Sequence, residues 1–128
     1  MKGKPNNIVR IPCSIDNSFF RYWFLFLEPF HKLTEREIDV ITSFVKHRYL
    51  LSKVIKDADI LDKVTMSSDT QEKVREECQI KVSHFQVIMG KLRKSKVIIN
   101  GKINPRFIPN ITEEDGVFQL LLLFDMKK

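Results

Sequence analysis

The chain has few of the residues on which catalytic and metal chemistry depend. Its 128 residues include two cysteines, Cys13 and Cys78, which are far apart in the sequence. A disulfide framework needs more cysteines, so this pair favours a reducing compartment. The three histidines, His31, His47 and His84, lie at no metal-ligand spacing from either cysteine, and the chain has no HExxH, CxxC, Walker loop or nucleophile elbow. We therefore expect a protein that is not an enzyme and uses no cofactor or metal.

Long apolar runs are also missing. The N-terminal MKGKPNNIVRIPC lacks the apolar stretch of a secretory signal. The dense apolar run from Phe19 to Leu27 contains Arg21 and is followed by Glu28 and Pro29, so it is too short to span a bilayer. The composition, 43% hydrophobic and 30% charged, is that of a globular chain. We expect one soluble domain over residues 1–128 that works inside a cell and has no membrane partner.

One long stretch has no acidic residue. Between Gln79 and Thr112 there is neither Asp nor Glu, whereas seven basic residues occur there: Lys81, Lys91, Arg93, Lys94, Lys96, Lys102 and Arg106. The net charge of the whole chain is +6, so the seven positive charges of this stretch account for the entire excess. A positive charge concentrated in one segment is typical of a surface that binds phosphates.

The same stretch predicts a helix followed by a hairpin. Ser83 can cap a helix over SHFQVIMGKLRKS, whose inward face consists of residues at helical spacing: Phe85, Ile88, Met89 and Leu92. Asn100 and Gly101 form a hairpin-type turn between the strands 97–99 and 102–104, and Pro105 ends the pairing.

Two helices are expected before this segment. Thr34-Glu35-Arg36-Glu37 is a capping box that opens a helix to about Leu51, with Leu33 and Ile38 as a hydrophobic staple. Ser68-Asp69-Thr70-Gln71 is a second capping box, and a tight connection over residues 79–82 buries Ile80. Residues 52–66 fit either a short helix or a loop.

The two ends of the chain are expected to add apolar elements. Residues 7–11 (NIVRI) predict an edge strand, and residues 117–124 (VFQLLLLF) predict a last, buried strand. Asp16 or Ser18 can cap a helix that Pro29 stops. That helix is apolar on nearly all sides, which indicates either a core helix or an oligomer contact. The oligomer contact would use the aromatic residues Phe19, Phe20, Trp23, Phe24 and Phe26.

Together these elements predict the α+β fold class. Two short helices, a tight turn and an NG hairpin indicate a winged helix-turn-helix, mostly helical, with a small antiparallel sheet. The expected segments are an N-terminal strand and aromatic helix (7–30), the helix-turn-helix with its wing (34–109), and a C-terminal strand (117–125).

Projection of the second helix at 100° per residue predicts which side chains meet DNA. Gln86 can pair with adenine and Val87 can touch a thymine methyl group, while Gly90 suggests the close approach of a backbone. Lysines and arginines are expected on phosphates. The full set of expected DNA contacts is Lys81, Ser83, His84, Gln86, Val87, Gly90, Lys91, Lys94, Lys96, Lys102 and Arg106. A solvated or protein-facing surface is the alternative, since lysines at a helix C-terminus also interact favourably with the helix dipole.

The runs FFRYWFLFLEPFHKLTEREIDVI, REECQIKVSHFQVIMGKLRKSKVI and GKINPRFIPNI resemble a small protein of crAss-like and related tailed bacteriophages. The resemblance covers most of the chain from Phe19 onward, and the INP segment over residues 103–105 also resembles plasmid replication initiators of the winged-helix type. The resemblance implies a phage origin and a winged-helix core.

Two functions follow from these expectations. The first is a non-enzymatic phage DNA-binding protein, regulatory or associated with replication, in the host cytoplasm. The second is a structural component of the virion, such as a portal-adaptor or neck-ring subunit on the same fold. DNA is the expected partner in the first case, and self-association or other phage proteins in the second.

Overall fold

The computed structural model describes residues 8–111, 116–121 and 123–127. These residues form a mostly helical α+β chain with one small antiparallel sheet, as the sequence predicted. The elements in chain order are α1 (Asn17–Phe26), α2 (Glu28–His31), α3 (Glu35–Ser52), α4 (Ala58–Thr65), α5 (Ser68–Glu77), α6 (Val82–Lys94), β1 (Ile98–Ile99), β2 (Lys102–Ile103) and the 3-10 turn η1 (Pro105–Phe107).

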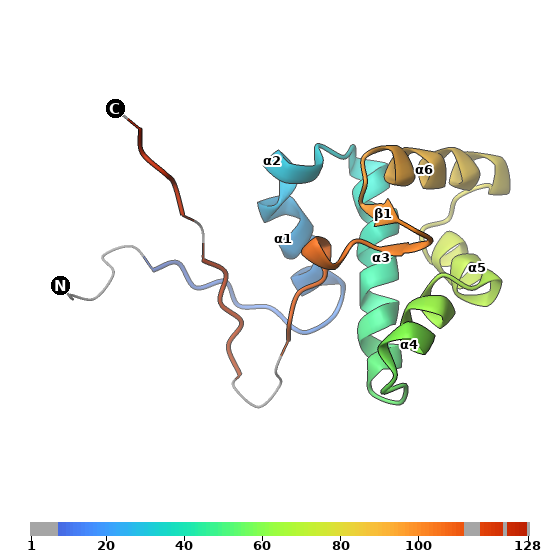
Figure 1. The fold of residues 1–128 in the computed structure, drawn as a ribbon, viewed down its shortest axis with the longest axis horizontal. Helices are drawn as coiled ribbons and strands as arrows, with labels where there is room; N and C mark the ends of the chain where they lie inside the picture. The colour runs from blue at the N-terminus through green and yellow to red at the C-terminus, as the bar shows by residue number, and fades with distance from the viewer. Residues whose placement is uncertain (1–7, 112–115, 122, 128) are drawn as a thin grey trace.

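Helix α3 is the centre of the fold, and α1, α4, α5 and α6 all pack against it (Figure 1). Its predicted capping box is present: the Thr34 hydroxyl accepts from the Glu37 backbone N–H, and the Glu37 carboxylate accepts from the Thr34 backbone N–H. The core side chains Ile41 and Phe44 of α3 are fully buried. This long helix therefore holds the other helices in place through one shared hydrophobic core.

Helix α1 buries one face, although its sequence is apolar nearly all round. Asp16 caps it by accepting from the Ser18 backbone N–H. Trp23 lies in the core and its indole N–H donates to the carbonyl of Phe107 at 2.8 Å. On the opposite side, Tyr22 and Phe26 remain exposed. The helix ends before Pro29, which lies in the first turn of the short α2 instead.

The second cap lies one residue earlier than expected. Ser67, not Ser68, accepts from the Thr70 backbone N–H, and the Gln71 side chain donates to the carbonyl of Met66. The predicted Ser68–Gln71 capping box is therefore wrong. Either of the two adjacent serines could cap a helix. The segment before them, which fitted either a helix or a loop, folds as α4 with Asp57 as its cap. The position of α4 brings Ser67 to the start of α5.

Four residues connect α5 to α6. Gln79 adopts the left-handed conformation (φ 54°), and the Ile80 backbone N–H reaches back to the carbonyl of Arg75 at 3.1 Å, as in a Schellman motif. The Arg75 side chain also donates to the carbonyl of Ile80. The Ile80 side chain is buried, as predicted. Helix α6 then starts at Val82 with Lys81 as a cap residue that makes no side-chain hydrogen bond, so the predicted Ser83 cap is wrong.

The predicted inward face of α6 is confirmed, because Phe85, Ile88, Met89 and Leu92 are all buried. The hairpin that follows is also confirmed. Ile98 pairs with Ile103 and Ile99 with Lys102, and the intervening Asn100 (φ 51°) and Gly101 (φ 74°) both have positive φ, as a type I′ turn requires.

The two terminal strands were predicted wrongly. Residues 8–11 and the described part of 117–124 form no strand, and their apolar side chains are largely exposed, for example Val9 (84%) and Phe124 (80%). Asn7 and Leu122 lie outside the described residues. An apolar run becomes a buried strand only beside a sheet that can receive it. The sheet described here has two strands of two residues each, and Ile98 and Ile103 already face the helical core.

Candidate nucleic-acid interface

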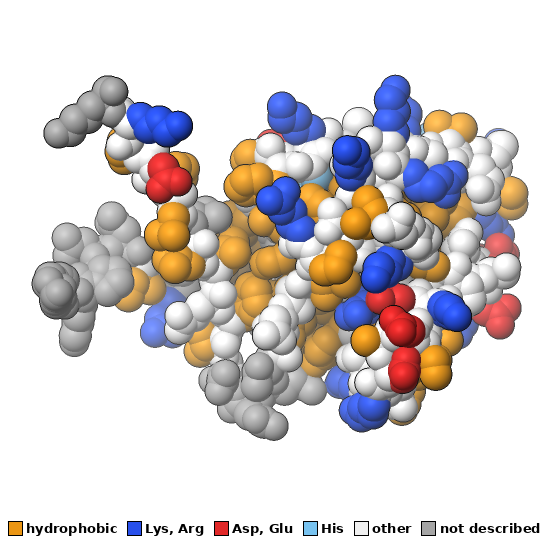
Figure 2. Space-filling model, viewed as in Figure 1, with side chains coloured by type: hydrophobic (Ala, Val, Ile, Leu, Met, Phe, Trp, Pro, Cys, Tyr) orange, Lys and Arg blue, Asp and Glu red, His pale blue; other side chains and the backbone are white. Residues whose placement is uncertain are grey.

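The basic residues of the stretch without acidic residues lie on α6, on the hairpin and on the segments next to them. We call the following set the basic surface: Lys81, Lys91, Arg93, Lys94, Lys96, Lys102 and Arg106. Six of the seven are exposed and Lys102 is half-buried. Figure 2 shows Lys and Arg side chains over the part of this face where α6 and the hairpin lie, and Asp and Glu side chains over α4 and α5.

Little of this positive charge is neutralised within the chain. Among the carboxylates that the structure describes, only that of Glu37 lies within 4 Å of a member of the basic surface, at 3.9 Å from Lys91 Nζ. Lys91 itself is 61% exposed, so this contact is a weak ion pair. The acidic side chains of α4 and α5 instead pair with other helices or within α5, as in Arg48–Asp62, Lys46–Glu77 and Arg75–Glu72. The basic surface is therefore open to an external anion.

The outward face of α6 is open as well. Ser83, His84, Gln86 and Val87 are exposed along its N-terminal half. Gly90 is half-buried, yet a Cβ built there would meet no atom within 4 Å. The chain's own packing therefore does not require a glycine at position 90, and the space beside it is free for another molecule.

Lys96 marks the junction between α6 and the hairpin. It adopts the left-handed conformation with φ 65°, at the position after the helix cap where glycine is usually preferred. The Lys96 carbonyl accepts from the Asn104 side chain at 3.0 Å, and the Asn104 backbone N–H donates to Val97 at 2.8 Å. These bonds hold the base of the hairpin against the end of α6, so that Lys94, Lys96 and Lys102 are carried by one rigid unit.

The N-terminal end of α6 has a different electrostatic environment. Gln86 and Glu72 of α5 line the same hollow, of about 210 Å³. A hydrogen bond from Arg75 lowers the pKa of Glu72. Arg75 lines the same hollow and pairs with Glu72, so the two leave no net charge there to attract a phosphate, whereas the uncharged Gln86 can still meet a base edge. The geometry favours phosphate contacts at the C-terminal half of α6 and at the hairpin.

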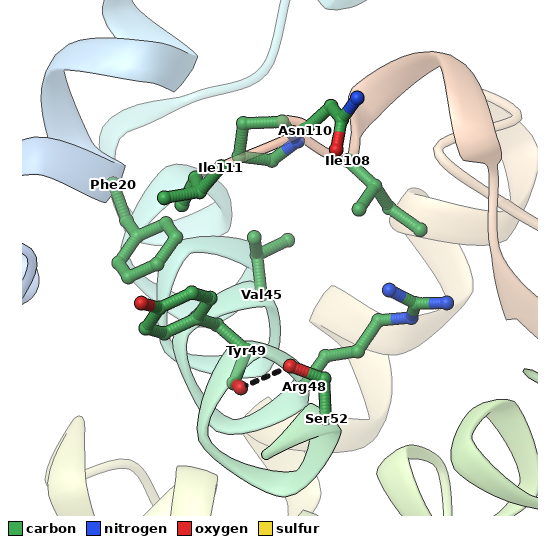
Figure 3. A pocket seen from close by; sticks show the side chains of 9 residues that line it. Phe20, Val45, Arg48, Tyr49, Ser52, Ile108, Asn110 and Ile111 are labelled. Carbon is green, nitrogen blue, oxygen red and sulfur yellow. Dashed lines mark hydrogen bonds between the residues drawn. The ribbon is translucent and has the colours of Figure 1, made fainter. Parts of the chain in front are cut away.

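A second hollow, which sequence analysis did not find, lies between α3 and the segment after η1. It has a volume of about 160 Å³ and is lined by Phe20, Val45, Arg48, Tyr49, Ser52, Ile108, Pro109, Asn110 and Ile111 (Figure 3). Arg48 at its edge is paired with Asp62 at 3.1 Å. Apolar side chains such as Val45 and Ile111 line it together with polar ones such as Ser52 and Asn110. No sequence motif marked it, because its wall forms only when residues 108–111 pack beside α3.

Among the residues that the structure describes, no group of three or more His, Cys, Asp or Glu side chains could hold a metal ion. Cys78 lies half-buried beside Asp39 and Glu77, and burial together with these charges raises the pKa of its thiol to about 11. The thiol therefore stays protonated at neutral pH and is a poor nucleophile.

Three of the five residues expected at an oligomer contact are buried within the chain. Phe20 and Phe24 are fully buried and Trp23 is 9% exposed. They pack against α3 and the segment around Phe107, so they have little surface to offer a partner. Phe26 is 47% exposed and Phe19 is half-buried, and only these two remain available.

Comparisons with protein-family models, with curated proteins and with solved structures found no match to this chain. The resemblance to phage proteins therefore stays a prediction. Within the described residues, no helix combines the length and the apolar character that crossing a membrane requires.

Proposed function

We propose that this chain is a non-enzymatic DNA-binding protein of the winged helix-turn-helix type. Helices α5 and α6 would form the helix-turn-helix, and the β1–β2 hairpin would be the wing. The short connection between the two helices and the hairpin directly after the second helix support this assignment. Helix α3, which packs against both α5 and α6, would be the first helix of the three-helix core.

The observation that carries the proposal is the unneutralised positive charge of α6 and the hairpin. Lys91, Lys94 and Lys96 would contact phosphates along one strand, while Lys102 and Arg106 would follow the wing to the next phosphates. Gln86 and Val87 would reach base edges in the major groove, because they are exposed on the uncharged half of α6. Positive charge of this kind supplies most of the affinity of a DNA-binding protein.

The phage origin implied by the resemblance would place this activity in gene regulation or replication within the host cytoplasm. A protein of this kind needs a folded positive surface, which the exposed lysines and arginines of α6 and the hairpin would provide.

A fluorescence anisotropy titration on a mixed-sequence duplex at low salt tests the proposal. We expect the double variant Lys91→Gln/Lys94→Gln to bind at least tenfold more weakly than the wild type. The matched control is Lys63→Gln/Lys73→Gln, which removes two exposed lysines from α4 and α5 and lowers the net charge equally. Equal losses in both variants would mean that net charge alone, and not this surface, attracts DNA.

The exposed apolar residues favour a second candidate function, a structural virion component. The described tail residues Leu121, Leu123 and Phe124 are each about 80% exposed, as expected of a segment that meets another protein. Mass spectrometry of purified virions would find the 15.1 kDa chain at a fixed, stoichiometric copy number if this candidate is right. A chain present in infected cells and missing from virions would exclude it.

A further inference from the structure

The C-terminal end of the chain exposes an apolar segment that leaves the helical body. We call residues 117–121 and 123–126 the apolar tail. They are extended rather than helical, and Figure 1 shows this end of the chain running away from the helices. From Val117 to Leu121, and again at Leu123 and Phe124, the tail has no charged residue. Exposure of so many apolar side chains to water is unfavourable, so such a segment favours contact with an apolar surface of a partner.

One tail residue shows which surface it fits. The ring of Phe118 packs edge-on against Phe19 at 5.1 Å and against Trp23 at 5.5 Å between ring centroids. Both of these residues belong to α1. The root of the tail is therefore already seated beside α1, in the edge-to-face geometry that aromatic rings prefer.

The exposed apolar side chains of α1 and α2 lie next to this contact. Tyr22 and Phe26 follow Phe19 and Trp23 at helical spacing and are 40% and 47% exposed, and Phe30 of α2 is 59% exposed. We call Tyr22, Phe26 and Phe30 the receptor face.

We propose that the apolar tail of one protomer binds the receptor face of a second copy of this chain, and that two copies exchange tails about a two-fold axis. The tail root and the receptor face lie next to each other in one chain, so a two-fold axis near Phe118 brings each tail over the other α1. From Phe118 to Phe124 an extended chain spans about 20 Å, whereas α1 rises only about 10 Å from Phe19 to Phe26. The tail is therefore long enough to cover the exposed side of α1.

The surface available is sufficient for a specific dimer. A fully buried aromatic side chain contributes about 150–250 Å², so Phe26, Phe30 and Phe124 alone would bury on the order of 300–400 Å² per copy. The aliphatic tail residues add to this, and two reciprocal contacts then exceed the roughly 1,000 Å² that a specific interface needs. Reciprocal exchange also closes the assembly, since each copy has one tail and one receptor face. This inference does not depend on DNA binding.

Sedimentation velocity on the full-length chain over a concentration series tests the exchange. We expect the wild type to reach twice the 15.1 kDa mass of one chain. The tail variant Leu121→Asp/Phe124→Asp and the receptor variant Phe26→Asp/Phe30→Asp should each raise the dissociation constant at least tenfold. The matched control Val54→Asp/Ile60→Asp also changes two exposed apolar residues and the charge by the same amount, and it should dimerise like the wild type.

Mixing the two deficient variants distinguishes exchange from other modes of association. The tail variant still has an intact receptor face and the receptor variant still has an intact tail, so the mixture should form a heterodimer through one contact. A wild type that stays monomeric at every concentration would overturn the proposal. A receptor variant that still dimerises, or a mixture that does not associate, would overturn it as well. Thermal unfolding of each variant near the wild-type midpoint would show that the exposed substitutions leave the fold intact.

Discussion

At the scale of single residues, burial separates the side chains that hold the fold from those that are exposed to solvent. Phe85 is 2% exposed and its ring lies 6.3 Å from that of Phe44, whereas Val87, two residues later on the same helix, is 54% exposed. The helical period alone was enough to predict this division along α6. Periodicity was less informative in α1, where the apolar residues surround the helix and only packing against α3 decides which of them are buried.

Truncation of Phe85 should be strongly destabilising. We expect Phe85→Ala to lower the free energy of unfolding by about 3–5 kcal/mol, since the ring is removed from a filled core and leaves a cavity. Urea-induced unfolding measures the loss. The control Val87→Ala, at an exposed position, should change the free energy by less than about 0.5 kcal/mol. Similar losses in the two variants would show that the register of α6 is wrong.

Stability should depend on pH through His47. Burial lowers the pKa of this imidazole, as do Lys46 and Lys73, while Glu77, 3.8 Å away, acts in the opposite direction. The pKa of His47 in the folded state is then below its unfolded value of 6.5. The unfolded chain therefore binds a proton more readily, and stability that is complete above about pH 6.5 is lost as the pH falls below that value.

Urea titrations at several pH values between about 7 and 5 measure this effect. We expect His47→Gln to make the fall in unfolding free energy over this window shallower than in the wild type. A His47→Gln profile that overlays the wild type would contradict the assignment.

At the scale of elements, the helix ends decide how α5, α6 and the hairpin are joined. Both α5 and α6 end in a Schellman motif: the Gln79 and Lys96 residues are left-handed, and the next residues, Ile80 and Val97, are buried. Neither left-handed residue is a glycine, so each costs conformational energy. If the Lys96 side chain contacts a phosphate, its contribution to DNA binding would explain why a lysine occupies this position despite the cost in stability.

Lys96→Gly should stabilise the fold and at the same time weaken DNA binding. Relief of the left-handed conformation should raise the free energy of unfolding by about 1 kcal/mol, while loss of the charge should weaken DNA binding. Gln79→Gly is the matched control, because it relieves the same conformation without a change of charge. It should be stabilised to a similar degree and bind DNA as the wild type does. Unchanged DNA binding by Lys96→Gly would show that the Lys96 side chain does not contact DNA.

Much of the fold could be predicted from local sequence signals, and the failures have physical causes. The Thr34 capping box, the inward face of α6 and the Asn100-Gly101 turn depend on contacts within a few residues, so the sequence alone was sufficient. The terminal strands failed because their burial depends on a sheet or partner far away in the sequence. The choice of Ser67 over Ser68 and the hollow beside Tyr49 depend on tertiary packing as well.

At the scale of the whole molecule, charge is divided between two regions. Helix α6 and the hairpin carry the basic surface, and α4 and α5 carry much of the acid, including Asp59, Asp62 and Glu72 (Figure 2). This division would orient the molecule, since a polyanion is attracted to one region and repelled by the other. The receptor face lies on α1 and α2, whereas the basic surface lies on α6, the hairpin and the segments next to them.

The salt dependence of binding to a mixed-sequence duplex tests the central claim most directly. If Lys91, Lys94, Lys96 and Lys102 each contact a phosphate, the logarithm of the binding constant should fall against the logarithm of salt concentration with a slope of about −3.6 or steeper. Lys91→Gln/Lys94→Gln should make this slope shallower by about two, whereas Lys63→Gln/Lys73→Gln and Gln86→Ala should leave it unchanged. No binding at low salt, or the same slope after the loss of Lys91 and Lys94, would contradict the account.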